Sequence, residues 1–205
     1  MKPKNILLIV TLIAAVVVIF YSMQESQDDT NYIAQINRER EEKDRFMKTA
    51  DDSPIAEKEK FKGLSYFTPN IKYKIVANLL PVEDKKVIVL ATNDGGEERY
   101  LEYAYAEFVL DGQKNRLVLL EMIDMGPLRG KLFLAFGDET SAIETYGAGR
   151  YLDVEKVPGA NTITLDFNKS YNPYCAYNET YRCPLPPREN LLKVAIRAGE
   201  KTYVH

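Results

Sequence analysis

The spacing of hydrophobic residues changes twice along this chain of 205 residues. Residues 6–23 form an apolar run without a charged side chain, residues 30–50 are mostly charged, and from residue 71 onward apolar and polar residues largely alternate. An apolar run of this length predicts a transmembrane helix, and alternation predicts β-strands with one buried face. We therefore expect a cytoplasmic tip (1–5), a transmembrane signal anchor (6–23), a charged helical stalk (24–52) and a single extracytoplasmic β domain (53–205).

The charges on either side of the apolar run predict its orientation. Lys2 and Lys4 precede the run, and Glu25 and Asp28 follow it. Because basic residues are retained on the cytoplasmic side of a membrane, the N-terminus is expected inside the cell and the rest of the chain outside. Cleavage as a signal peptide is the alternative, but residues 20–23 lack the small-x-small pattern of a cleavage site. The expected location is the cell membrane, with one span and the C-terminal domain in the periplasm or at the cell surface.

The charged segment 30–50 has the composition of a helix. Pairs such as Glu39 and Lys43 are spaced i to i+4 in the favourable order. Few apolar residues interrupt the charges, so most of this helix is expected to face water and to dock only at its far end; a partner-binding helix is the weaker alternative. Ser53 can cap a short second helix that Gly63 ends.

The rest of the chain predicts a β domain. Runs rich in Val, Ile, Leu, Tyr and Phe occupy residues 71–77, 86–92, 99–110, 116–122 and 131–136, followed by 162–167, 191–197 and 201–204. Short turn-forming segments, such as Asp111-Gly112, separate the early runs. Since connections this short join antiparallel neighbours, the expected fold is mainly β: an antiparallel sheet folded as a sandwich or incomplete barrel, preceded by the transmembrane helix and the charged helix.

Residues 136–187 are the strongest candidate for a functional site. Three phrases stand out there: Phe-Gly-Asp-Glu-Thr-Ser (136–141), Tyr-Gly-Ala-Gly-Arg-Tyr-Leu-Asp (146–153) and Leu-Asp-Phe-Asn-Lys-Ser-Tyr-Asn-Pro-Tyr-Cys-Ala-Tyr (165–177). They crowd ionisable, amide and phenol side chains among glycines and prolines. This mixture is typical of irregular backbone that holds polar groups in fixed places.

Arg150 has two interpretations. Its planar guanidinium, in a glycine-bounded turn, can clamp a carboxylate or phosphate, or it can pair with Asp138, Asp153 or Asp166 and lock the loops together. The glycines at 147–149 do not make a dinucleotide fingerprint, because the third glycine is missing and no helical pattern follows.

A second polar group surrounds Asp166. Asp166 and Asn168 are two residues apart and share one face if the segment is a strand, and Tyr171 and Asn172 follow in a turn stiffened by proline. Such a face can hold a sugar or another polar ligand, or it can be a network that satisfies loop backbone. The candidate ligand-binding residues are Asp138, Tyr146, Arg150, Tyr151, Asp166, Asn168, Tyr171 and Asn172.

Composition narrows the function. The formal net charge is −3, which disfavours nucleic-acid binding. His205 is the only histidine, so a Ser-His-Asp or Cys-His site is absent, and it cannot complete a metal site with only two cysteines; no cofactor is expected. Cys175 and Cys183 are expected to form a disulfide in an oxidising compartment, with a redox pair as the less favoured reading of their spacing.

The phrases at 138–153 and 165–177, with Cys-Pro-Leu-Pro-Pro at 183–187 and Ala-Gly-Glu-Lys at 198–201, resemble those of the bacterial domain-of-unknown-function 1684 family. The resemblance extends from about Phe46 to Lys201 and implies a secreted or membrane-bound protein. It implies no activity, and whether the protein is an enzyme stays open.

Three functions are compatible with the sequence. The first is a binding module for a small polar or anionic envelope ligand, held by the 138–190 loops. The second is a histidine-free hydrolase that uses Asp138 or Asp166 with Arg150. The third is a structural envelope protein without a ligand site.

Overall fold

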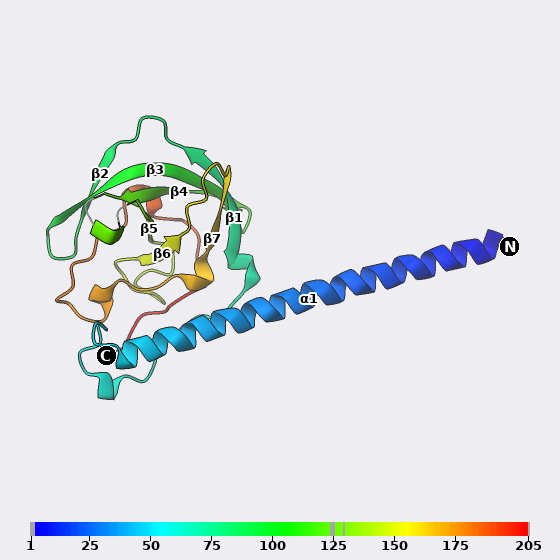
Figure 1. The fold of residues 1–205 in the computed structure, drawn as a ribbon, viewed down its shortest axis with the longest axis horizontal. Coiled ribbons are helices and arrows are strands. Elements are labelled where there is room, and N and C mark those ends of the chain that lie inside the picture. Colours follow the sequence, from blue (N-terminus) through cyan, green and yellow to red (C-terminus); the bar gives the residue numbers. More distant parts are fainter. Residues whose placement is uncertain (1–2, 124–125, 129, 205) are drawn as a thin grey trace.

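The computed structural model describes residues 3–123, 126–128 and 130–204, although the side chains of residues 3–12, 14–26 and 127 lie outside that description. The chain begins with one long helix, α1 (Pro3–Thr49), and continues into a β domain. The N-terminal half of α1 extends away from the rest of the molecule, and its last turns lie against the β domain (Figure 1).

The expected transmembrane segment belongs to α1. Within the described part of the chain, no helix is long and apolar enough to cross a membrane. The segment itself, residues 6–23, has side chains outside that description. Membrane anchoring therefore stays a prediction from the sequence.

The β domain is built on one antiparallel sheet. Its strands are β1 (Lys74–Pro81), β2 (Val87–Ala91), β3 (Glu97–Leu110), β4 (Gln113–Met122), β5 (Leu132–Phe136), β6 (Arg150–Val154) and β7 (Thr162–Asp166). They are ordered β6-β5-β4-β3-β1-β7, and β2 pairs with β3 beside β1. The tight β3–β4 turn uses Asp111 and Gly112, both with positive φ (52° and 76°), as a two-residue hairpin requires.

The sheet curls until its two ends approach each other, as Figure 1 shows. The chain beyond β7 joins the far edge strand: the Tyr151 N–H of β6 donates to the Tyr171 carbonyl at 2.8 Å, and the Tyr171 N–H donates back at 3.0 Å. The expectation of a mainly β, antiparallel, incompletely closed sheet is thereby confirmed.

Both faces of the sheet centre are buried. Alternate β4 residues point to opposite sides: Leu117 and Leu119 pack in the larger core enclosed by the curled sheet, and Val118 and Leu120 pack in a second cluster with the cysteines. Burial on both sides explains why β4 and β5 read as nearly continuous apolar runs.

Three local predictions were wrong. β6 lies where the sequence analysis placed a site turn, because Arg150 and Leu152 point into the interior. Residues 191–197 alternate in burial as a strand would, but their backbone bonds go to the 137–139 loop instead of a ladder, and 201–204 is irregular. The short helix after Ser53 is reduced to one 3₁₀ turn, Lys58–Lys60; the Ser53 hydroxyl accepts from the Ile55 amide at 3.2 Å and donates to the Met47 carbonyl at 2.6 Å.

α1 docks more extensively than its charge suggested. Tyr32, Ile36 and Met47 are buried, so the helix presents one continuous face to the β domain over its last five turns. Neighbouring polar side chains of that face, Arg40 and Lys43, also contact the β domain. The expectation that only the far end of the helix docks was wrong, because long charged side chains cover a protein surface with their stems while their heads make polar contacts.

Candidate binding site

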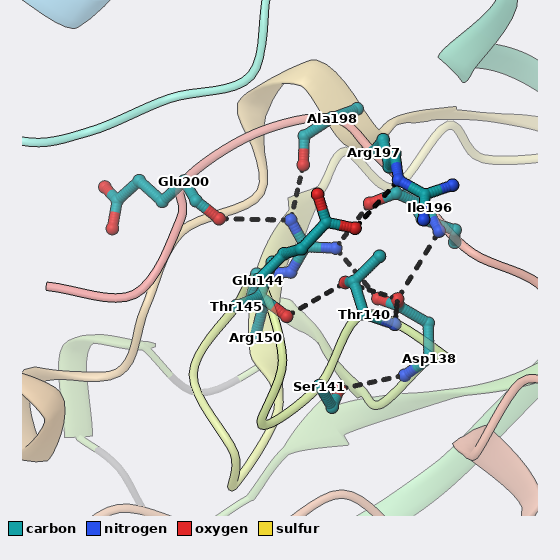
Figure 2. Close-up of polar contacts among 10 residues, drawn as sticks. All are labelled: Asp138, Thr140, Ser141, Glu144, Thr145, Arg150, Ile196, Arg197, Ala198 and Glu200. Carbon is teal, nitrogen blue, oxygen red and sulfur yellow. Dashed lines mark hydrogen bonds and ion pairs between the residues drawn. The ribbon is translucent and has the colours of Figure 1, made fainter.

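Arg150 is the largest fully buried side chain among the described residues, and its contacts show its role. The guanidinium is 1% exposed and forms an ion pair with Asp138, Nη2 to Oδ2 2.8 Å. Its Nη2 also donates to the Ile196 carbonyl at 2.9 Å, and its Nη1 donates to the carbonyls of Ala198 and Glu200. Figure 2 shows these contacts converging on the guanidinium.

The Asp138 carboxylate is also held by hydrogen bonds within the protein. Its Oδ1 accepts hydrogen bonds from the Thr140 amide at 2.7 Å and the Thr140 hydroxyl at 2.6 Å. Burial lowers the pKa of Arg150, and the charge of Asp138 opposes that shift by favouring the cation. We call Arg150, Asp138 and Thr140 with the 196–200 carbonyls the arginine lock. It joins the 138–145 loop to the C-terminal segment, which is the second of the two interpretations of Arg150.

Asp166 and Asn168 hold other parts of the chain in place. Asp166 Oδ1 accepts a hydrogen bond from the Tyr32 hydroxyl of α1 at 2.7 Å and from the Asn168 amide at 3.2 Å. The Asn168 side chain pairs with the backbone of Asn70, accepting at 2.9 Å and donating at 2.8 Å. These groups anchor α1 and the start of β1.

Glu200, which the sequence analysis did not select, connects the arginine lock to α1. Its carbonyl faces Arg150, and Figure 2 shows its carboxylate pointing away from the lock. That carboxylate is 1% exposed and forms an ion pair with Lys43 of α1 at 2.5 Å. It also accepts from the Asn172 amide at 2.9 Å and from the Tyr177 hydroxyl.

A cavity of about 560 Å³ lies between α1 and the loops that follow β7. This volume is typical of small-molecule sites. We call it the helix–loop cavity. Its lining comprises residues of α1 (Ile36, Glu39, Arg40, Lys43, Phe46, Met47), Tyr66, β6 (Tyr151, Asp153), residues 168–174 except Asn172 (Asn168, Lys169, Ser170, Tyr171, Pro173, Tyr174), residues 181–184 (Tyr181, Arg182, Cys183, Pro184) and Glu200.

Most charges around the helix–loop cavity are paired, whereas Asp153 accepts a hydrogen bond from the Tyr171 hydroxyl at 2.8 Å. Besides Lys43 with Glu200, Lys169 lies 2.9 Å from Glu39, and Arg182 lies 2.7 Å from Asp94 just outside the lining. Arg40 instead donates from Nη1 to a backbone carbonyl at 2.9 Å and lies over the Tyr66 ring, 4.5 Å from its centroid. The lining exposes more apolar than polar surface, and its charges are therefore close to balanced.

Several polar atoms of the lining have no partner. Among the described residues, the buried side-chain atoms without a hydrogen bond include Arg40 Nε, the Tyr66 hydroxyl oxygen and Ser170 Oγ. All three residues line the helix–loop cavity. An unpartnered buried polar atom costs free energy, so each one calls for an explanation, and binding of another molecule is one. Arg150 Nε and Asn172 Oδ1 also lack a partner but lie outside this lining.

Tyrosine rings form much of the cavity wall. Tyr174 and Tyr181 meet edge to face, with centroids 5.3 Å apart, and both are half-buried. Burial raises the pKa of Tyr66 and Tyr171, so both phenols stay protonated at neutral pH; Tyr171 donates to Asp153, and the Tyr66 hydroxyl has no partner. The wall thus offers apolar ring faces beside hydroxyl groups.

Cys175 and Cys183 do not form the expected disulfide. Both are free and buried, and Cys183 Sγ accepts a hydrogen bond from the Cys175 amide at 3.2 Å. A hydrogen bond from Cys183, helped by the Tyr146 hydroxyl, lowers the pKa of Cys175 to about 7 despite its burial. The structure keeps the two residues together through packing in the second hydrophobic cluster, so proximity in space does not require the covalent bond.

The structure places only some of the candidate residues from the sequence analysis at the helix–loop cavity. Tyr151, Asn168 and Tyr171 line the helix–loop cavity, whereas Arg150, Asp166 and Asn172 do not. Asp138 borders a smaller hollow of about 280 Å³ over the glycine turn, and Tyr146 packs against the second hydrophobic cluster.

The sequence analysis did not select the cavity-lining residues of α1, because a charged helical segment is expected to face water. The four-residue steps from Tyr32 to Ile36 to Arg40 were the available signal. Within the described part of the chain, no cluster of three or more His, Cys, Asp or Glu residues is arranged to hold a metal ion.

Comparisons with known proteins concern most of the chain. Residues 59–201 match the family described as protein of unknown function (DUF1684). The solution NMR structure of an uncharacterized protein of Haloarcula marismortui is 37% identical, with a TM-score of 0.64, over 86% of this chain and 97% of that chain. A search of curated proteins gave no match.

Proposed function

The chain belongs to the DUF1684 family of proteins of unknown function, and because membership carries no activity, we propose from its cavity that it binds a small polar molecule. The binding site is the helix–loop cavity. The observation that carries this proposal is the coincidence of a cavity of about 560 Å³ with unpartnered polar atoms of Arg40, Tyr66 and Ser170 in its lining.

The position of the site differs from the one suggested by the sequence. The arginine lock has no role in binding in this proposal, since Asp138 and three carbonyls accept hydrogen bonds from the two terminal nitrogens of the guanidinium and leave only Nε without a partner. It supports binding indirectly, because it holds the segment from which Glu200 reaches Lys43.

A hydrolase based on Asp138 or Asp166 is less well supported. A general base must reach a substrate proton. Asp138 accepts from Thr140 and pairs with Arg150, Asp166 accepts from Tyr32, and neither carboxylate lines the helix–loop cavity.

The same proposal includes the location of the site. The helix that lines the cavity from Ile36 to Met47 continues without a break toward residues 6–23. With that segment in a membrane and the N-terminal lysines inside, the cavity would stand outside the cell, about 20 Å along the helix from the bilayer, at 1.5 Å per residue. Its ligand would then come from the cell envelope or the medium.

A thermal-shift screen of the full-length protein tests the binding function. The screen compares wild type with Tyr181→Ala, which opens the cavity wall, and with Tyr103→Ala, a matched change on β3 outside the lining. A ligand at 100 times its dissociation constant should stabilise wild type and Tyr103→Ala by about 2.7 kcal/mol, and Tyr181→Ala by less. Equal stabilisation of both variants by every hit, or no hit at all across sugars, amino acids, nucleotides and organic acids, would refute the proposal.

A further inference from the structure

The helix–loop cavity has features that select among small polar molecules. We infer that its ligand is a neutral saccharide, a polyhydroxylated ring with one apolar face. This inference rests on the proposed binding function and specifies the class of ligand. It follows from the charge balance, the ring faces and the unpartnered polar atoms of the lining.

The charge balance argues against a charged ligand. Each lysine of the lining has a carboxylate within 2.9 Å, as has Arg182 through Asp94. An anion at either lysine or at Arg182 would have to displace a carboxylate, and a cation at Glu39 or Glu200 would have to displace an ammonium group. Arg40 and Asp153, the two remaining charges of the lining, have opposite signs, so the lining with Asp94 carries no net charge that would attract an ion. The Glu200 carboxylate is also 1% exposed and repels a second buried anion beside it. A neutral ligand incurs neither cost.

The rings supply an apolar surface of suitable size. Arg40 already covers the Tyr66 ring and Lys43 covers the Tyr171 ring, with cation-to-centroid distances of 4.5 and 4.4 Å. Tyr174 and Tyr181 have no cation on their rings among the described contacts, and both line the cavity half-buried. The axial C–H groups of a sugar ring pack on such faces, as apolar groups do on aromatic side chains generally.

The unpartnered atoms match hydroxyl groups. Arg40 Nε can only donate, whereas the Tyr66 and Ser170 hydroxyls can donate or accept. A sugar hydroxyl also does both, so several neighbouring hydroxyls of one ring can satisfy this mixed set after small rotations of the side chains. An aliphatic or purely aromatic ligand would leave the same atoms unpartnered.

The test is a calorimetric titration of the full-length protein with neutral hexoses, N-acetylhexosamines and short neutral oligosaccharides, beside uronic acids, sugar phosphates and amino acids. A neutral sugar is expected to bind. Ser170→Ala and Tyr66→Phe each remove a hydroxyl that has no partner in the protein. Both variants should therefore remain as stable as wild type while the dissociation constant rises about two- to tenfold.

Two controls keep this inference separate from the binding function. Tyr103→Phe, outside the lining, should leave the dissociation constant unchanged. If only charged compounds bind, and the cavity variants weaken them, the saccharide inference is overturned while the binding function stands. If no compound of the wider thermal-shift screen binds, both are overturned. Sugar binding that neither Ser170→Ala nor Tyr66→Phe weakens also overturns the assignment to this cavity.

Discussion

The arginine lock and the helix–loop cavity lie on opposite sides of the same C-terminal segment and use their polar groups differently. Glu200 belongs to both, through its carbonyl on one side and its carboxylate on the other. In the lock, an ion pair is closed off by loop hydroxyls and carbonyls. In the cavity lining, side-chain atoms of Arg40, Tyr66 and Ser170 have no hydrogen-bond partner, whereas among the described side chains of the lock only Arg150 Nε lacks one.

This difference distinguishes two roles that buried polar groups have in the protein. A buried ion pair that is also bonded to backbone carbonyls helps to specify the path of irregular backbone, and the 138–145 and 196–200 segments are irregular. A buried hydroxyl without a hydrogen-bond partner does not help to determine the fold, so its presence favours a role in binding another molecule. The sequence motif around Arg150, which looked most like a functional site, is thus the region with the structural role.

The largest expected effect comes from breaking the lock. Asp138→Ala leaves the Arg150 guanidinium buried without a counter-charge and should lower the free energy of unfolding by about 3–5 kcal/mol, measured by guanidinium chloride denaturation. Arg182→Met, which removes the exposed partner of Asp94, is the control and should change stability little. A loss below about 1 kcal/mol for Asp138→Ala would show that the lock is not structural.

The next effect concerns the turn before Arg150. Gly149 has φ of +90°, and a Cβ there would lie 2.6 Å from the Phe136 carbonyl oxygen. Gly149→Ala should therefore cost roughly 2–4 kcal/mol from backbone strain and overpacking together.

Gly159 provides the matched control for that substitution. It also has positive φ, +75°, but no atom lies within 4 Å of the Cβ position. Gly159→Ala should cost only the strain, about 1 kcal/mol. Equal losses in thermal unfolding would mean that the close packing around Gly149 contributes nothing.

A smaller effect is expected where α1 forms the cavity wall. Tyr32→Phe removes the hydrogen bond to Asp166, which keeps its contacts with Asn168. The expected loss is about 1–2 kcal/mol, accompanied by faster proteolysis within α1. Unchanged stability and proteolysis, relative to Tyr103→Phe, would indicate that the docked helix does not depend on this bond.

The smallest effect is a pH dependence at the cavity rim. Burial raises the pKa of Glu39, but hydrogen bonds from Lys169 and Gln35 outweigh burial and bring the pKa below its ordinary value. A lowered carboxyl pKa stabilises the folded state above the unfolded pKa, and this stabilisation is lost as pH falls through the folded pKa.

Glu39→Gln measures that contribution. Because both partners are about 40% exposed, wild type should exceed the variant by no more than about 0.5 kcal/mol at neutral pH. The difference should vanish on acidification from about pH 6 to about pH 3, followed by urea denaturation. A difference that persists at the acid end would assign the effect to packing instead of charge.

The sequence by itself determined most of the strands from Lys74 to Phe136 and the antiparallel pairing of β2 with β3, β3 with β4 and β4 with β5, but not that β1 pairs with β3 instead of β2. Alternation and two-residue turns are local signals, and the β3–β4 turn at Asp111 and Gly112 needs no distant partner to form. The chemistry of Arg150 also predicted an acidic partner as one of two interpretations, with Asp138 as one of three candidates.

Only the tertiary structure decided which polar groups face a cavity. Burial of Arg150 depends on carbonyls at 196–200, and the cavity depends on α1 docking through Tyr32 and Arg40 onto residues more than a hundred positions away. A charged helix such as residues 30–50 has the same local pattern whether it is docked or solvated. The contacts that distinguish the two states arise only when the curled sheet brings the distant segments together.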